Sequence, residues 1–294
     1  MPAKTWPSFF VAATCRLKCN VACSLASRKP PHLRGDPFLF RRAIVRPPAG
    51  NFAHGLTTAE LGKPNSALAL SQHDAYCRAL ESSKLELICL PPDLEHPDST
   101  FVEDTAVLTR PSAIVTRPGA PSRVTEVAAI RDAIRPFYRV VHEIHSPGTL
   151  DGGDVCEAGS HFFIGVSHRT NEEGARQLGE FLSADGFTSS LVDIRGCSSI
   201  LHLKSGITYL QDNDLVVMQE LAEREEFQAF NLIPVTAEES YACNCLLVNG
   251  RVLVAAGFPR VVSQLVRRGY RTFPLEMSEF RKMDGGLSCL SLRF

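Results

Sequence analysis

Short hydrophobic runs alternate with amphipathic stretches from about residue 40 to the C-terminus. The short runs are typical of buried strands, whereas the longer stretches repeat their apolar positions with a helical period. The strands predicted in this way are 42–46, 85–90, 101–109, 113–117, 138–144, 154–157, 161–166, 188–194, 201–204, 208–211, 245–248, 252–255 and 270–275. The predicted helices are 64–82, 121–134, 171–184, a short one near Gln219 and one that begins at Pro259 and ends at Gly269. The pattern therefore predicts an α/β protein with many short strands.

The order strand–strand–helix–strand recurs about four or five times, with a period of roughly 45 residues. The clearest copy is the last, where Asn249-Gly250 predicts a tight hairpin turn and Pro259 begins a helix. Repetition on this scale favours radially arranged modules over a single open parallel sheet. The polar loops at one end of such modules would converge on a central site.

The first part of the chain, residues 1–39, has a composition of its own. It carries six Lys or Arg residues and no acid before Asp36. This composition fits a targeting peptide, a disordered extension or a wrongly assigned start, whereas Arg16 and Lys18 interrupt the apolar core of a secretory signal. Cysteines at 15, 19 and 23 match no standard zinc spacing. We therefore predict a basic N-terminal extension in residues 1–39 and a single domain in residues 40–294.

Composition and charge exclude several classes of function. The protein has 294 residues, of which 44% are hydrophobic and 21% charged, and its formal net charge is −1. This balance gives no field that would attract nucleic acid or an anionic membrane, and no apolar run approaches the roughly 20 residues that span a bilayer. Ten cysteines at irregular spacing are typical of reduced, buried thiols. We expect a cytoplasmic protein with no nucleic-acid or membrane partner, unless residues 1–39 direct it elsewhere.

Two clusters of acidic residues lie at the starts of predicted strands. Asp98, Glu103 and Asp104 lie within seven residues, and strand alternation would place Glu103 and Asp104 on opposite faces. An acid that enters the interior needs a cation beside it, although a solvated loop with a salt bridge explains the same residues. The second cluster is the segment LDGGD, residues 150–154. Its glycines let the backbone approach a ligand closely, and a simple turn is the alternative.

A cysteine, a histidine and two arginines supply further candidate chemistry. Cys289 follows a Gly-Gly pair at the head of a last, terminal strand, where a thiol can be exposed at the end of a sheet. His202 lies far from it in sequence, as the base of a cysteine nucleophile usually does, although a structural histidine explains His202 taken alone. Arg123 and Arg169 lie in loops, where arginines are usually solvated but also bind carboxylates bidentately.

Six segments of the chain together resemble the motifs of one enzyme family. PDSTFVEDTAVLTR, RPGAPSR, LDGGDV, SHRTN, LHLKS and GGLSC occur in this order, with matching spacing, after residue 39. They resemble the motifs of dimethylarginine dimethylaminohydrolase, a family of the guanidino-modifying superfamily. The resemblance implies the pentein fold, which is a five-bladed α/β-propeller. It does not extend to residues 1–39.

The same resemblance implies roles for individual residues. Cys289 corresponds to the nucleophile, His202 to the general acid and base, and Asp151 to the acid that accompanies them. Asp104 corresponds to the acid that binds the substrate guanidinium, with Glu103 beside it. The other substrate-binding positions that it implies are Asp98 and the backbone near Leu56 for the α-amino group, Arg123 and Arg169 for the α-carboxylate, and the backbone of Met283.

The resemblance implies a small-molecule guanidino substrate, either asymmetric dimethylarginine or monomethylarginine. Hydrolysis of its C–N bond would give citrulline and an alkylamine through a covalent thiouronium intermediate on Cys289. Two carboxylates would hold the planar cation over the sulfur, and the cation would in turn favour the thiolate. We expect no metal or organic cofactor, and His142 and His145 lack the further ligands of a metal site.

Several alternatives share part of this chemistry. An arginine deiminase, another hydrolase of ω-substituted arginines and an amidinotransferase would use the same nucleophile. Arginine deiminases usually carry an extra helical insertion that this chain lacks, which favours the dimethylarginine substrate. The non-enzymatic alternative is a pentein that binds a macromolecule, which need not retain Cys289, His202 and the paired acids together. The oligomeric state is open, with a homodimer as one candidate.

Overall fold

Five three-stranded sheets make up residues 39–294, the part of the chain that the computed structural model describes. The predicted N-terminal extension, including its three cysteines, falls outside this range apart from Leu39. The strands are β1 (Arg42–Val45), β2 (Glu86–Cys89), β3 (Ala106–Leu108), β4 (Ala113–Val115), β5 (Val141–Glu143), β6 (Val155–Ala158), β7 (His161–Val166), β8 (Thr188–Asp193), β9 (Ile207–Tyr209), β10 (Asp214–Met218), β11 (Asn231–Val235), β12 (Leu246–Val248), β13 (Arg251–Ala255), β14 (Arg271–Leu275) and β15 (Leu292–Arg293).

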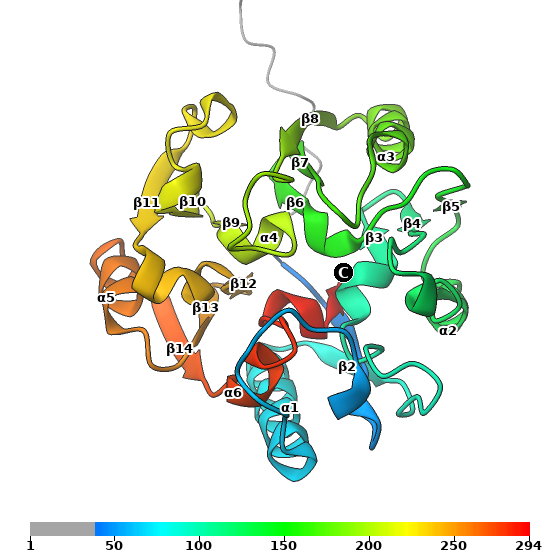
Figure 1. The fold of residues 1–294 in the computed structure, drawn as a ribbon. Helices are drawn as coiled ribbons and strands as arrows, with labels where there is room; N and C mark the ends of the chain where they lie inside the picture. The colour runs from blue at the N-terminus through cyan, green and yellow to red at the C-terminus, as the bar shows by residue number, and fades with distance from the viewer. Residues whose placement is uncertain (1–38) are drawn as a thin grey trace, which may run out of the picture. The chain divides into compact units, whose positions relative to one another are not determined.

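All five sheets share one topology. A middle strand pairs antiparallel with an inner strand and parallel with an outer strand, as β4 does with β3 and β5. The C-terminal strand β15 supplies the inner strand of the first sheet, where Ala43 pairs with Arg293. The sheets lie around a common centre with the inner strands nearest to it (Figure 1). The predicted five-bladed α/β-propeller is confirmed.

Helices connect the middle and outer strands in four of the five modules. They are α1 (Ser66–Ser82), α2 (Val127–Ile134), α3 (Glu172–Ala184) and α5 (Pro259–Arg267). In the module of β9–β11 two 3₁₀ turns, η5 (Gln219–Leu221) and η6 (Glu225–Phe227), take this place. The helix predicted near Gln219 is therefore wrong. A single α-helix is not favoured here, because the two buried side chains of this segment, Leu221 and Phe227, would lie on different faces of it.

Local signals determine where several elements begin and end. The Asn65 side chain accepts the Leu68 N–H at 3.0 Å and so caps α1, and Asn171 caps α3 in the same way. Asn249 and Gly250 have φ values of 46° and 79°, which confirms the predicted hairpin turn between β12 and β13. These features depend on a few neighbouring residues, which is why the sequence pattern predicts them well.

Two predicted strands are replaced in part by helical turns. Strand β3 starts only at Ala106, because residues Val102–Thr105 form the 3₁₀ turn η2. Residues Leu203–Gly206 form the short helix α4, which replaces the strand predicted at 201–204. Since η2 is not extended, strand alternation does not apply there, and Glu103 and Asp104 are both buried.

A short helical turn precedes the inner strand in every module. These turns are η2, η4 (Gly152–Asp154), α4, η7 (Ala237–Cys243) and η8 (Ser288–Leu290). Neighbouring turns contact one another at one end of the ring of inner strands. The fold therefore gathers five short segments from distant parts of the chain. No helix within residues 39–294 has the length and apolar character needed to cross a membrane.

Candidate active site

The turns before the inner strands carry the predicted chemistry. Asp104 lies in η2, Asp151 directly precedes η4, His202 directly precedes α4, and Cys289 lies in η8. The structure therefore brings together residues that are up to 185 positions apart, as the ring closes through hydrogen bonds such as the one between Ser288 and η2. Each of these residues lies in, or directly before, a short helical turn, and the inner strand of the module follows that turn.

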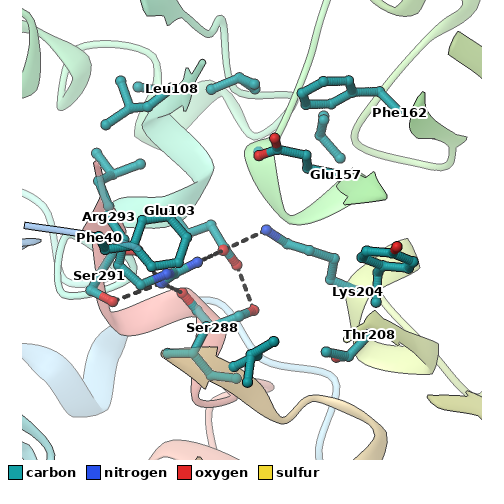
Figure 2. Close-up of a pocket in the computed structure, with 18 of the residues that line it drawn as sticks. Phe40, Glu103, Leu108, Glu157, Phe162, Lys204, Thr208, Ser288, Ser291 and Arg293 are labelled. Carbon is teal, nitrogen blue, oxygen red and sulfur yellow. Dashed lines mark hydrogen bonds and ion pairs between the residues drawn. The ribbon is translucent and has the colours of Figure 1, made fainter. Parts of the chain in front are cut away.

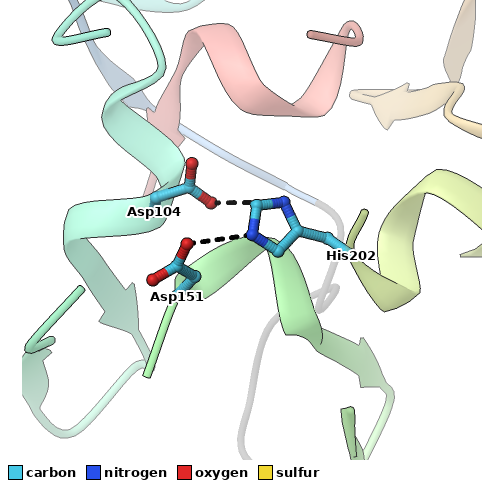
Figure 3. Close-up of side chains that lie close together, drawn as sticks. All are labelled: Asp104, Asp151 and His202. Carbon is cyan, nitrogen blue, oxygen red and sulfur yellow. Dashed lines mark hydrogen bonds and ion pairs between the residues drawn. The ribbon is translucent and has the colours of Figure 1, made fainter. Parts of the chain in front are cut away.

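His202 lies close to two carboxylates (Figure 3). Its Nε2 is 2.9 Å from Asp151 Oδ2, and its Nδ1 is 4.0 Å from Asp104 Oδ1. Asp151 is fully buried, and its other oxygen accepts the Gly119 N–H at 2.8 Å. Two acids beside one imidazole stabilise the imidazolium, with the Nε2 proton directed at Asp151.

The charges in this cluster shift the pKa values of its members. Burial opposes the charge of His202, but Asp104, Asp154 and Asp151 outweigh it and raise the pKa of His202 to about 9. Burial also opposes the charge of Asp104, but His202 and Arg123 outweigh it and lower the pKa of Asp104. At neutral pH the cluster therefore contains a protonated His202 and an ionised Asp104, which are an acid and an anion ready for proton transfer and cation binding.

Two glycines allow these turns to pack closely. A Cβ atom at Gly153 would lie 2.7 Å from Asp104 Oδ1 and 2.8 Å from His202 Nδ1. A Cβ atom at Gly152 would lie 2.1 Å from the Glu103 carbonyl oxygen. The close backbone approach expected of this glycine pair is present, but it is made to the neighbouring turns.

Cys289 lies beside the same cluster. Its side chain is buried, and its Sγ accepts the Gly286 N–H at 3.5 Å. Burial, followed by the charges of Glu103 and Asp104, raises the pKa of Cys289 to about 12. The Gly286 N–H and Lys204 oppose this shift only in part. The protein without a ligand therefore holds a thiol, and a cation bound near the sulfur would lower its pKa.

One small cavity brings together all of the predicted site residues except Asp151 and Glu103. Asp151 is in contact with the cavity through its hydrogen bond to His202. The cavity is lined by Leu56, Asp98, Phe101, Asp104, Arg123, Arg169, Leu201, His202, Met283, Asp284, Gly285 and Cys289. It thus presents a thiol, a proton donor and a carboxylate to one bound molecule.

Asp98 provides a second buried carboxylate at this cavity. Both of its oxygens accept the Leu56 N–H, at 3.0 and 3.2 Å. Burial raises the pKa of Asp98, and Arg123 opposes the shift in part. A Cβ atom at Gly55 would lie 2.3 Å from Asp98 Oδ1, so this glycine lets the loop close onto the acid. An ammonium group bound here would favour the ionised carboxylate.

The two predicted arginines both line the cavity, but their surroundings differ. Arg123 is buried and forms ion pairs with Asp104 Oδ2 and Glu126 Oε1, each at 2.5 Å. Its Nη2 also donates to the Phe101 carbonyl at 3.1 Å. Its guanidinium therefore already neutralises buried acids. Arg169 is half-buried and forms no ion pair with residues 39–294, so its charge is available to a ligand.

Glu103 faces away from this cavity. Figure 2 shows its carboxylate in a second cavity, of about 150 Å³, which the five inner strands surround. Lys204 and Arg293 form ion pairs with its Oε1, and the Ser288 hydroxyl donates to its Oε2 at 2.6 Å. The structure therefore does not place Glu103 beside Asp104 at a ligand, because η2 directs these neighbouring acids into different cavities.

Three polar residues near the site were not predicted. Asp154 is fully buried, accepts a hydrogen bond from the Ser167 hydroxyl at 2.6 Å, and has a pKa that burial raises to about 6. The motif LDGGDV already contains it. Glu126 is signalled only by its position three residues after Arg123, and Asn244 has no motif around it.

Asp104, Asp151 and His202 form one set of possible metal ligands within residues 39–294, with ligand atoms that lie within 4.8 Å of one another. The proton on His202 and the hydrogen bonds to both carboxylates already use these atoms, so a metal ion would have to displace a proton. The expectation that no metal is required stays a prediction. His142 stacks on Phe181 at a centroid distance of 4.3 Å and belongs to no such set in the described part of the chain.

Known proteins resemble this chain in sequence over most of the described residues. A sequence model of the arginine deiminase family matches residues 97–249. The chain is 47% identical over 257 residues to N(G),N(G)-dimethylarginine dimethylaminohydrolase of Pseudomonas aeruginosa, which covers 87% of this chain and 100% of the relative. Identity to the protein of the same name from Streptomyces coelicolor is 37% over 255 residues, covering 86% and 96%.

Solved structures extend this similarity to three dimensions. A mutant of the Pseudomonas aeruginosa enzyme complexed with citrulline superimposes with a TM-score of 0.85 at 46% identity, covering 87% of this chain and 100% of that one. The N-terminal domain of the arginine dihydrolase ArgZ from cyanobacteria superimposes with a TM-score of 0.76 at 16% identity, covering 86% and 96%. At this low identity the second likeness concerns the fold alone.

Proposed function

We infer the function of this chain from its site and from its family. The chain belongs to the dimethylarginine dimethylaminohydrolase family. It is a hydrolase that converts dimethylarginine, a small-molecule guanidino substrate, to citrulline and dimethylamine. One observation carries this conclusion for the chain itself: the Cys289 thiol, the protonated His202 and the ionised Asp104 line a single small cavity.

The substrate guanidinium is proposed to lie between Cys289 and the two acids at His202. Asp104 is the carboxylate that faces it directly from the cavity wall. Asp151 does not line the cavity; it is 2.9 Å from His202 and compensates the charge of that imidazolium, which leaves Asp104 to the guanidinium. Holding a planar cation against the fixed Asp104 carboxylate places its central carbon within reach of the sulfur.

The amino-acid end of the substrate is proposed to lie at the other side of the cavity. Asp98 and the backbone carbonyl of Leu56 receive the α-amino group, and Arg169 binds the α-carboxylate. The backbone of Met283 contributes a further contact. Arg123 was expected to share the carboxylate with Arg169, but its ion pairs support a different main task, which is to hold the guanidinium-binding acid in place.

In the first half of the proposed reaction the bound cation lowers the pKa of Cys289, and the thiol loses its proton to water. The thiolate attacks the guanidinium carbon, a C–S bond forms, and a neutral tetrahedral centre results. The His202 imidazolium then gives its proton to the dimethylamino nitrogen, and the C–N bond breaks. Dimethylamine leaves, His202 is neutral, and a cationic thiouronium group remains on Cys289.

In the second half the neutral His202 accepts a proton from water as the water oxygen attacks the thiouronium carbon. The C–S bond of this second tetrahedral centre breaks, and the proton of its hydroxyl group passes to the departing sulfur. Citrulline, the Cys289 thiol and the His202 imidazolium are the products. Asp104, Asp154 and Asp151 raise the pKa of His202 to about 9. At neutral pH His202 therefore starts the reaction protonated and regains its proton in the second half.

Product analysis tests this function directly. Purified protein and a Cys289→Ser variant are incubated with asymmetric dimethylarginine and, separately, with arginine. We expect the wild type to release citrulline and dimethylamine in equal amounts from dimethylarginine, and the variant to release neither. Citrulline and ammonia from arginine alone would instead identify an arginine deiminase, a family whose sequence model also matches this chain.

Location and assembly are separate parts of the proposal. We propose a cytoplasmic location, which is supported by the seven free cysteines in residues 39–294. The homodimer stays a prediction that size-exclusion chromatography with light scattering can test.

A further inference from the structure

Four of the five turns that precede inner strands already carry residues of the proposed reaction. The fifth turn, η7, is followed directly by Asn244, to which the reaction gives no role. Asn244 is 5% exposed and lies against Gly286, where an added Cβ atom would come within 2.5 Å of the Asn244 side chain. Asn244 lies two residues before its inner strand β12, as Asp104 does before β3.

The Asn244 side chain joins the turn of His202 to the turn of Cys289. Its Oδ1 accepts the Ser288 N–H at 2.9 Å. Its Nδ2 donates to the Ser288 hydroxyl and to the Lys204 carbonyl, each at 3.0 Å. Ser288 directly precedes Cys289, and Lys204 lies two residues after His202. A single amide group thus links the segments that hold the nucleophile and the proton donor.

A further hydrogen bond determines the direction of this amide. The Ser288 hydroxyl donates its proton to Glu103 Oε2 at 2.6 Å. This bond lies at the second cavity, where Lys204 and Arg293 neutralise Glu103 (Figure 2). A hydroxyl that donates to a carboxylate can only accept from its other neighbour. Asn244 must therefore present its NH₂ group to Ser288 and its oxygen to the Ser288 N–H, so the network has one orientation.

We propose that Asn244 is a positioning residue, which sets the distance between the Cys289 sulfur and the His202 imidazole through Ser288 and Lys204. The inference rests on the proposed function, because it assigns Asn244 to that reaction. Asn244 does not line the cavity that contains Cys289. Its loss should therefore lower kcat and leave KM nearly unchanged.

The variant Asn244→Asp tests this role with almost no change in shape. It replaces two N–H donors by an oxygen that faces the Ser288 hydroxyl and the Lys204 carbonyl, so the link between the turns is broken. We expect kcat for dimethylarginine to fall about 100-fold, since small displacements of reacting groups have effects of this size. We expect KM to change by less than about threefold.

The matched control is Asn249→Asp, which makes the same chemical change far from the site. Asn249 also bridges backbone groups: it donates to the Phe40 and Ser83 carbonyls at 2.9 and 2.8 Å and accepts the Phe40 N–H at 2.8 Å. This variant should lose thermal stability and keep the kcat of the wild type. A loss of kcat in Asn249→Asp similar to that in Asn244→Asp would overturn the proposal.

Ser288→Ala provides a second variant without a change of charge. It keeps the Ser288 N–H bond to Asn244 and removes the hydroxyl, so we expect kcat to fall about tenfold. Both site variants should also shift the midpoint pH of Cys289 alkylation by iodoacetamide, a measurement that needs no turnover. Wild-type kcat in Asn244→Asp, or unshifted midpoints in both variants, would overturn the positioning role.

The same experiments separate this inference from the proposed function. If the wild type releases no dimethylamine, the proposed function is wrong, and the alkylation midpoints alone decide whether Asn244 positions Cys289. If the wild type is active and Asn244→Asp is equally active, the function stands and the positioning role is wrong.

Discussion

Asp104 and Glu103 are neighbours in one turn, yet they serve two cavities of opposite character. On one side, Asp104 faces the protonated His202 and the small cavity proposed to bind the substrate cation. On the other side, Glu103 is neutralised within the protein by Lys204 and Arg293. The direction in which the turn points each acid, and not the type of residue, therefore determines whether its charge faces a ligand or is paired within the protein.

Neutralising each of the two acids in turn should give the largest difference in activity. Asp104→Asn removes the carboxylate proposed for guanidinium binding and one cause of the raised pKa of His202, so kcat/KM should fall about 10³–10⁴-fold. Glu103→Gln keeps an acceptor for the Ser288 hydroxyl and should lower kcat/KM by no more than about tenfold. Dimethylamine release measures both variants, and equal losses would contradict the division between the two cavities.

Lys204→Met tests the structural side by its effect on stability. The variant leaves the buried Glu103 with Arg293 as its remaining ion-pair partner, so the free energy of unfolding should fall by about 3 kcal/mol. Urea unfolding monitored by fluorescence measures this loss. Glu103→Gln in the same chain should restore part of it, because the uncompensated charge is then removed. An unchanged unfolding free energy in Lys204→Met would show that this pair does not stabilise the fold.

Asp151→Asn tests the proposed role of His202 through the pH dependence of kcat. The pKa of His202 is raised from 6.5 to about 9, so His202 can protonate the leaving amine below that pH and loses this ability as the pH rises through it. The same shift stabilises the folded state fully below pH 6.5, and this contribution is lost as the pH rises through about 9. Asp151→Asn removes a hydrogen bond and a negative charge that raise this pKa, so the alkaline limb of kcat should move to lower pH.

The corresponding measurement is kcat across the neutral and alkaline range for both proteins. At the pH where the wild type begins to lose activity, the variant should be slower by about tenfold, as expected for a change of roughly one unit in the pKa of an essential acid. An alkaline limb at the same pH in both proteins would mean that another group limits the reaction there.

Arg176→Ala gives the smallest effect and a baseline for the buried ion pairs. Arg176 lies on the exposed surface of α3 and pairs with Glu173 and Glu180 at 2.7 and 2.5 Å. Because water screens such pairs, the free energy of unfolding should change by less than about 0.5 kcal/mol, with kcat unchanged. A loss as large as that of Lys204→Met in the same urea experiment would remove the contrast between buried and exposed pairs.

Much of the fold could be predicted because its signals are local. The hairpin turn at Asn249-Gly250 and the repeated order of strands and helices depend on neighbouring residues. The predictions failed at residues 102–105 and 201–204, where turns replace the expected strands. Those turns are stabilised by contacts with other modules, such as the close packing of Gly153 against Asp104 and His202, which no local pattern contains.

The site could be predicted only as far as its motifs reach. The resemblance identified eight of the twelve residues that line the small cavity, Cys289 and His202 among them. It could not show that Glu103 points away or that Arg123 is bound by buried acids, since both depend on the path of the backbone in η2. Asn244 lies in a module without a motif, and only the contacts between turns reveal it.

The central claim of the mechanism is a covalent bond between Cys289 and the guanidinium carbon of the substrate. Rapid acid quenching during turnover of asymmetric dimethylarginine, followed by peptide mass spectrometry, tests it most directly. We expect an adduct of citrulline minus one water on the peptide that contains Cys289, formed with release of dimethylamine and absent from Cys289→Ser. An adduct on another residue, or citrulline formed by Cys289→Ser at the wild-type rate, would show that Cys289 is not the nucleophile.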